Sequence, residues 1–155
     1  MDKNQMQRRE KAAAIFKEGY NCAQAVAMSF ADETEMDEKT LAKLASSFGG
    51  GMGRLREVCG AVSGMFLIFG MLYGYDSAKD VDGKKEQYRQ IQEMAFEFEK
   101  KHGSIVCREI LKKPEGHDHF EPAERTENYY ATRPCESCVA DAAEILEIFL
   151  KKMKK

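Results

Sequence analysis

The chain has 155 residues, enough for one domain that buries a hydrophobic core of its own. Hydrophobic residues make up 43% of it and charged residues 32%, a composition that excludes an intrinsically disordered chain. The formal net charge of -2 creates no overall basic field, so we expect no nucleic-acid partner. The first ten residues lack the apolar stretch of a secretory signal, and we expect a cytoplasmic protein whose cysteines are kept reduced.

Apolar residues recur at helical spacing along most of the chain, and no segment alternates like a half-buried strand. We therefore predict an all-α fold, a single helical domain over residues 1–155 built as a compact bundle of about six helices. The apolar stripe of the helix at 84–102 is assigned to the core, although an exposed stripe there would pair two subunits as a homodimer. In chain order the predicted helices cover about residues 5–17, 21–30, 41–48, 58–75, 84–102 and 134–153, with a short helix around Cys107 and a long irregular segment at about 113–133.

Residues 58–75 contain no charged side chain and form the most apolar part of the chain. The segment falls short of the roughly 20 apolar residues that a membrane-spanning helix needs, so we expect no membrane span. A helix that is apolar on every side is otherwise the buried helix at the centre of a bundle. Its glycines at spacing four, Gly60 with Gly64 and Gly70 with Gly74, are expected to let neighbouring helices approach closely.

Five cysteines, an odd number in a chain expected to be cytoplasmic, indicate redox or metal chemistry more than a set of structural disulfides. Each lies in or near the first turn of a predicted helix, where free backbone N–H groups and the helix dipole favour a thiolate. Apolar neighbours also turn the sulfurs partly inward, and burial raises the pKa of a thiol. The sequence leaves open which effect is larger. The five are Cys22, Cys59, Cys107, Cys135 and Cys138.

A glycine-rich loop at residues 49–53 precedes Cys59 and is followed by Arg54 and Arg56. It lacks the Gly-Lys-Ser/Thr ending of a phosphate-binding P-loop, and no predicted strand precedes it. We interpret the loop as a flexible connection that lets the helix of Cys59 approach its neighbours. The alternative is a small anion held by the loop with Arg54 or Arg56. Both arginines favour the thiolate form of Cys59.

Cys135 and Cys138 form a C-x-x-C pair at the start of a predicted helix, an arrangement that supports reversible dithiol chemistry. The strands of a thioredoxin are not predicted around this pair, and the second pair of a zinc finger is missing. Another candidate metal cluster, His117-Asp118-His119, lies in the irregular segment. A polar loop tract is the commoner explanation for it, because metal ligands need convergent partners.

Several of these residues also occur together in a known family. Gly19 to Gln24 reads GYNCAQ, Gly50 to Arg54 is glycine-rich, and Cys59 to Gly64 reads CGAVSG. With Cys107-Arg108-Glu109 and Cys135 further along, the chain resembles the C_GCAxxG_C_C family over nearly its whole length. The resemblance implies a small helical protein with thiol redox chemistry. Carried over by position, the family cysteines correspond to Cys22, Cys59, Cys107 and Cys135, and Cys138 is an extra one.

The leading hypothesis is a thiol-based redox protein, which includes a thiol–disulfide oxidoreductase, acting without a cofactor on a small molecule or redox partner that the sequence does not name. Cys59 is assigned as the attacking thiolate, and Cys22, Cys107 or Cys135 as the thiol that resolves the mixed disulfide. Arg54, Arg56, Cys138, Gly60 and Gly64 are assigned supporting roles. One alternative is a zinc or iron–sulfur module that uses Cys22, Cys59, Cys107 and Cys135 as ligands. Another is a non-catalytic helical interaction protein whose cysteines serve packing.

Overall fold

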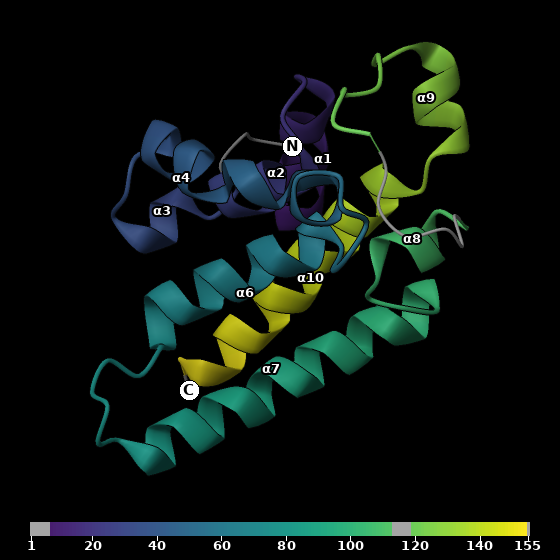
Figure 1. The fold of residues 1–155 in the computed structure, drawn as a ribbon. Helices are drawn as coiled ribbons and strands as arrows, with labels where there is room; N and C mark the ends of the chain where they lie inside the picture. Colours follow the sequence, from purple (N-terminus) through teal and green to yellow (C-terminus); the bar gives the residue numbers. More distant parts are fainter. Residues whose placement is uncertain (1–6, 113–118, 155) are drawn as a thin grey trace.

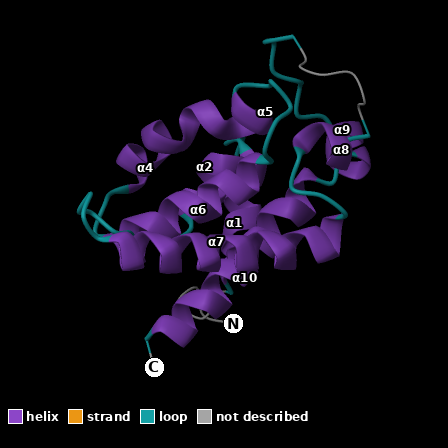
Figure 2. Cartoon of the chain, turned by 60° about the horizontal axis from the view of Figure 1, so that its bottom comes forward, coloured by secondary structure: helices purple, strands orange, loops and turns teal. Residues whose placement is uncertain are grey.

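The structure, a computed structural model, describes residues 7–112 and 119–154 (Figure 1). Regular structure in these two ranges is helical, apart from one isolated bridge between Val58 and Val106, which confirms the all-α prediction (Figure 2). The elements are α1 (Arg8–Lys17), α2 (Cys22–Met28), α3 (Ala31–Thr34), α4 (Glu38–Ala45), η2 (Ser46–Phe48), α5 (Gly49–Met52), α6 (Gly60–Tyr73), α7 (Val81–His102), α8 (Cys107–Ile110), α9 (Glu127–Thr132) and α10 (Cys135–Met153).

The helix α10 packs against four other helices, α1, α2, α6 and α7 (Figure 1). A hydrophobic core joins these helices, and Phe16, Phe69, Phe98 and Leu146 are among its fully buried side chains. Burying a side chain of this size contributes about 1.5–3 kcal/mol to stability. The apolar stripe predicted for the last helix therefore faces the core, because it lies against four other helices at once.

The helix α6 was predicted as the buried centre of the bundle, and this holds for its first half. Each residue from Gly60 to Met65 is buried, between α2 on one side and α10 on another. The second half reaches the surface, where Met71 is 52% exposed. The physical reason is length, because α6 has 14 residues and its main neighbour α2 has only 7.

The two glycine pairs of α6 differ in role. A Cβ added at Gly60 would lie 2.4 Å from the Cys22 sulfur, and one at Gly64 would lie 2.7 Å from the Ala23 carbonyl oxygen. These two glycines therefore allow α2 and α6 to touch, as predicted. At Gly70 the nearest atom would be the side-chain nitrogen of Gln87 at 3.6 Å, so the prediction of close helix contact is wrong for this pair.

The start of α2 is fixed by a capping box. The side chain of Asn21 accepts a hydrogen bond from the backbone N–H of Gln24, and the Gln24 side chain accepts one from the Asn21 backbone N–H. Asn21 is thus the N-cap that the sequence predicts, and Cys22 is the first residue of the helix. This cap determines where the Cys22 side chain enters the site described below.

The segment predicted to be irregular at 113–133 contains the short helix α9 at its end. Thr126 caps this helix by accepting a hydrogen bond from the backbone N–H of Tyr129, a local signal that the sequence prediction missed. Residues 113–118, like 1–6, lie outside the described part of the chain. Within the described part, no helix is both long and apolar enough to cross a membrane.

Candidate functional site

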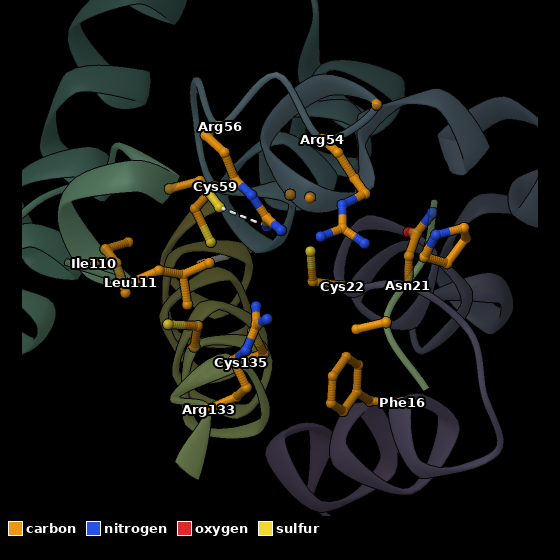
Figure 3. Close-up of a pocket in the computed structure, with 18 of the residues that line it drawn as sticks. Phe16, Asn21, Cys22, Arg54, Arg56, Cys59, Ile110, Leu111, Arg133 and Cys135 are labelled. Carbon is orange, nitrogen blue, oxygen red and sulfur yellow. Dashed lines mark hydrogen bonds between the residues drawn. The ribbon is translucent and has the colours of Figure 1, made fainter. Parts of the chain in front are cut away.

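One pocket of about 280 Å³ collects all five cysteines of the chain (Figure 3). It lies where the first turns of α2, α6, α8 and α10 meet the glycine-rich loop. Helix starts that are distant in sequence thus converge, which is what the placement of the cysteines predicted. The thiols are free, without a disulfide between them. The cysteines that line the pocket are Cys22, Cys59, Cys107, Cys135 and Cys138.

Backbone pairing places Cys59 and Cys107 diagonally across a short antiparallel bridge. The backbone N–H of Cys59 donates to the Ile105 carbonyl at 2.7 Å, and that of Cys107 donates to the Glu57 carbonyl at 2.6 Å. These bonds flank the antiparallel bridge between Val58 and Val106. Because side chains alternate along extended chains, Cys59 and Cys107 leave the pair on the same face, opposite that of the two valines. Their sulfurs interact, since a charge on Cys59 would raise the pKa of Cys107.

The glycine-rich loop is wound in the left-handed region and is not the flexible connection that the sequence suggested. Gly50 and Gly51 have φ of 67° and 71°, and Arg54 and Arg56 adopt φ of 68° and 59°. Such angles are unfavourable for residues with a side chain and persist where the surroundings enforce them. A Cβ at Gly51 would lie 2.6 Å from the Cβ of Cys107, so the loop packs directly against this cysteine.

Arg56 contacts the sulfur of Cys107, whereas the sequence assigned this arginine to Cys59. Its Nη1 donates a hydrogen bond to the Cys107 sulfur at 3.5 Å, and the side chain is buried with only 4% exposure. Arg54 donates to the backbone carbonyl of Glu121 on the far side of the pocket. Arg56, which the sequence predicted to activate Cys59, therefore contacts a thiol that lies 51 positions after Arg56 in the chain.

Burial outweighs the helix dipole at the four cysteines of the family pattern. It raises the pKa of Cys22 and of Cys135 to about 12, and the charges of neighbouring thiols add to this. The pKa of Cys59 is raised well above its usual value, first by a hydrogen bond with Cys138 and then by burial. The pKa of Cys107 is also raised by burial, but Arg56 and then Arg133 oppose the shift. Cys107 is thus the thiol for which the pocket provides positive charge.

The pocket wall is rich in arginine. Arg54, Arg56, Arg125 and Arg133 line it, and no Asp or Glu is among the described residues that do so. Figure 3 shows the guanidinium groups of Arg54, Arg56 and Arg133 pointing into the space that the Cys22 and Cys59 side chains also face. Guanidinium groups form charge-assisted hydrogen bonds with anionic groups, so this surface is suited to an anion.

Two of these arginines rest on aromatic side chains of α1 and α9. The guanidinium of Arg125 lies 4.2 Å from the Phe16 ring centre and donates to the backbone carbonyls of Phe16 and Tyr20. The guanidinium of Arg133 lies 5.3 Å from the Tyr129 ring centre, and no carboxylate in residues 7–112 and 119–154 forms an ion pair with it. The sequence prediction missed Arg125 and Tyr129 because it treated their segment as irregular. The N-cap residue Thr126, followed by two adjacent aromatic residues, was the signal in the sequence that could have identified a helix there.

The four cysteines proposed as metal ligands meet in the pocket but do not form a ligand set. Among the residues that the structure describes, no three His, Cys, Asp or Glu side chains are grouped closely enough to hold a metal ion. A tetrahedral zinc site needs four ligands at about 2.0–2.3 Å from one point. The other candidate, the His117-Asp118-His119 cluster, cannot be placed, since His117 and Asp118 lie outside the described residues.

Comparison with family models places the same cysteines in a known pattern. The model described as "Putative redox-active protein (C_GCAxxG_C_C)" matches residues 20–149. The chain belongs to the C_GCAxxG_C_C family. This match spans the capped start of α2, the glycine-rich loop, the bridge and most of α10, so all five cysteines of the pocket lie inside the family region. No curated protein and no solved structure matches the chain.

Proposed function

We propose that this C_GCAxxG_C_C protein carries out thiol–disulfide exchange with a small anionic disulfide in the arginine-lined pocket. The observation that carries the proposal is the hydrogen bond from Arg56 to the Cys107 sulfur, within a pocket that four other thiols line. A thiolate is the attacking species in disulfide exchange, and a cation beside the sulfur stabilises it. This assigns the attack to Cys107 in place of Cys59.

The reaction is a two-electron exchange. The Cys107 thiolate attacks one sulfur of the substrate disulfide, the substrate S–S bond breaks, and the leaving thiolate takes up a proton. Cys59, which lies diagonally from Cys107 at the bridge, then attacks the Cys107 sulfur and releases the second substrate thiolate, which also takes up a proton. Two protein thiols are thereby oxidised to one disulfide, and the substrate disulfide is reduced to two thiols.

The substrate class follows from the charge of the pocket. Four arginines line the pocket, so a substrate with carboxylate or similar anionic groups gains charge-assisted hydrogen bonds there. The same arginines stabilise each leaving thiolate. Cysteines that served packing alone would lie against apolar side chains, whereas these border a cavity with charged groups.

Three disulfides of similar size test this proposal on reduced protein under anaerobic, single-turnover conditions. They are 3,3′-dithiodipropionate, which is a dianion, bis(2-hydroxyethyl) disulfide, which is neutral, and cystamine, which is a dication. We expect the dianion to react fastest and its advantage to shrink in high salt and in Arg133→Gln. Arg89→Gln, on the exposed face of α7, is the matched control and should change nothing. Equal rates for the three disulfides would overturn the anionic substrate class, and an unreactive Cys107 would overturn the exchange reaction.

A further inference from the structure

The extra cysteine of the C-x-x-C pair has partners of its own that the reaction above does not use. Cys138 is only 2% exposed, and its sulfur lies 3.7 Å from Nδ1 of His102. The other ring nitrogen of His102, Nε2, lies 2.8 Å from Oδ2 of Asp141. A cysteine and a carboxylate of α10 thus hold a histidine of α7 between them.

The carboxylate decides which nitrogen of His102 carries the proton. Nε2–H donates to Asp141, so Nδ1 presents its lone pair to the Cys138 thiol. The charged groups around this line come from three helices. The other oxygen of Asp141 lies 3.2 Å from Arg9 of α1 and 4.0 Å from Lys101 of α7, and Glu144 of α10 pairs with both cations.

Cys138 is also the direct neighbour of Cys59. Both line the pocket and lie in the hydrophobic core, and the interaction with the Cys138 side chain is the largest cause of the raised pKa of Cys59. Cys59 therefore has thiol partners on two sides, with Cys107 at the bridge and Cys138 on α10. Cys107 has an arginine beside its sulfur, and Cys138 has a histidine beside its own.

We propose that Cys138 is a second resolving thiol, with His102 as its general base, and that it moves the new disulfide from Cys59–Cys107 to Cys59–Cys138. The inference rests on the proposed exchange reaction, which supplies the first disulfide. His102 Nδ1 takes the proton of Cys138, and the Cys138 thiolate attacks the Cys59 sulfur. The S–S bond between Cys59 and Cys107 breaks, and Cys107 leaves as a thiolate beside Arg56. One disulfide replaces another, so no outside oxidant or reductant is needed.

The transfer has a consequence for the pocket. It returns Cys107 to the thiolate state while the oxidising equivalent is stored at Cys138, one of the most buried of the five cysteines. Asp141 acts through His102 as a positioning residue. His102 is catalytic in this step, because its nitrogen contacts the reacting thiol.

Disulfide mapping after a single turnover tests the transfer. Reduced protein is mixed with 3,3′-dithiodipropionate, quenched with acid at set times, alkylated and analysed by peptide mass spectrometry. We expect the wild type to pass from Cys59–Cys107 to Cys59–Cys138, and Cys138→Ser to stop at Cys59–Cys107. In His102→Gln the second step should slow by about 100-fold or more, the usual contribution of a general base. Asp141→Asn should slow it less and alter its pH profile, and the exposed Lys100→Gln should leave it unchanged.

The outcomes separate the two proposals. A wild-type disulfide that stays at Cys59–Cys107 overturns the transfer and leaves the exchange reaction standing. Failure of Cys107 to form any mixed disulfide overturns the exchange reaction itself. A Cys59–Cys138 disulfide that forms in Cys107→Ser at the wild-type rate would also overturn the transfer, since it would not pass through Cys107. A His102→Gln variant with an unchanged rate and pH profile would remove His102 from the step.

Discussion

The Nη1 atom of Arg56 lies 3.5 Å from the sulfur of Cys107, although 51 positions of sequence separate the two residues. The loop that carries Arg56 is held in left-handed backbone angles, and Gly51 in the same loop packs against the Cβ of Cys107. The arginine and the thiol are thus positioned by one compact substructure. Reactivity in the pocket should depend on this pair more than on the helix dipoles.

Replacing Arg56 by Gln should make Cys107 less reactive. The guanidinium lowers the pKa of the Cys107 thiol against the effect of burial, so its loss lets the pKa rise further. At pH 8 the rate of Cys107 alkylation should fall by about tenfold for each unit of that rise, because only the thiolate reacts. The measurement is iodoacetamide labelling of Cys107, followed by mass spectrometry across pH. Arg56→Lys should recover part of the rate, and an Arg56→Gln profile that overlays the wild type would refute the assignment.

Alkaline pH should destabilise the reduced protein through its buried thiols. Burial raises the pKa of Cys22 and Cys135 to about 12 in the folded chain, whereas an unfolded cysteine ionises near about 8.5. The folded state thus binds more protons above that pH. The contribution of these thiols to the free energy of unfolding is fully present below about pH 8.5. It is lost as pH rises toward 12, by about 1.4 kcal/mol per pH unit for each thiol.

Urea unfolding between pH 9 and 10, with a phosphine reductant present, measures this slope. The double variant Cys22→Ala with Cys135→Ala should lose about 3 kcal/mol per pH unit of the dependence, which is twice the value for one thiol. Equal slopes for the variant and the wild type would show that these two thiols are not buried as neutral groups.

Two glycines of the same helix should respond in opposite ways to alanine. The Cβ of Gly64→Ala would lie 2.7 Å from the Ala23 carbonyl oxygen, so α2 and α6 must separate. We expect a loss of about 1–3 kcal/mol in the free energy of unfolding. Gly70→Ala meets nothing closer than 3.6 Å and should gain up to about 1 kcal/mol from helix propensity. The free energies of unfolding of both variants are measured by urea unfolding. An unchanged stability in Gly64→Ala would mean that the two helices are not in contact at this position.

Two N-cap residues, one beside the pocket and one away from it, allow the effect of a cap on stability to be separated from its effect on the geometry of the site. Asn21→Ala and Asp37→Ala each remove a side-chain acceptor from the start of a helix, and each should cost about 1 kcal/mol. Only Asn21 adjoins Cys22 and lines the pocket. Labelling of Cys22 should therefore change in Asn21→Ala and stay at the wild-type rate in Asp37→Ala. Equal labelling in the two variants would show that the cap does not position this thiol.

Much of the fold could be predicted from local patterns. The capping box at Asn21, the apolar stripe of α10 and the close approach at Gly60 and Gly64 each depend on residues a few positions apart. Helical periodicity and capping act over that range, so a single sequence displays them. Helix α9 was missed because six residues are too few for a periodic signal.

The chemistry of the site depends on contacts between distant segments. Helix starts favour thiolates, and the sequence correctly placed cysteines at them, but the balance at each sulfur is set by what covers it. The interaction with Cys138 and then burial raise the pKa of Cys59. Arg56 contacts Cys107, because the left-handed loop and the bridge at Val58 bring that arginine to α8. His102 meets Cys138 only after α7 packs on α10. Desolvation and charge act through space, so the tertiary packing decides which of the five thiols has a cation, a base or only other thiols beside it.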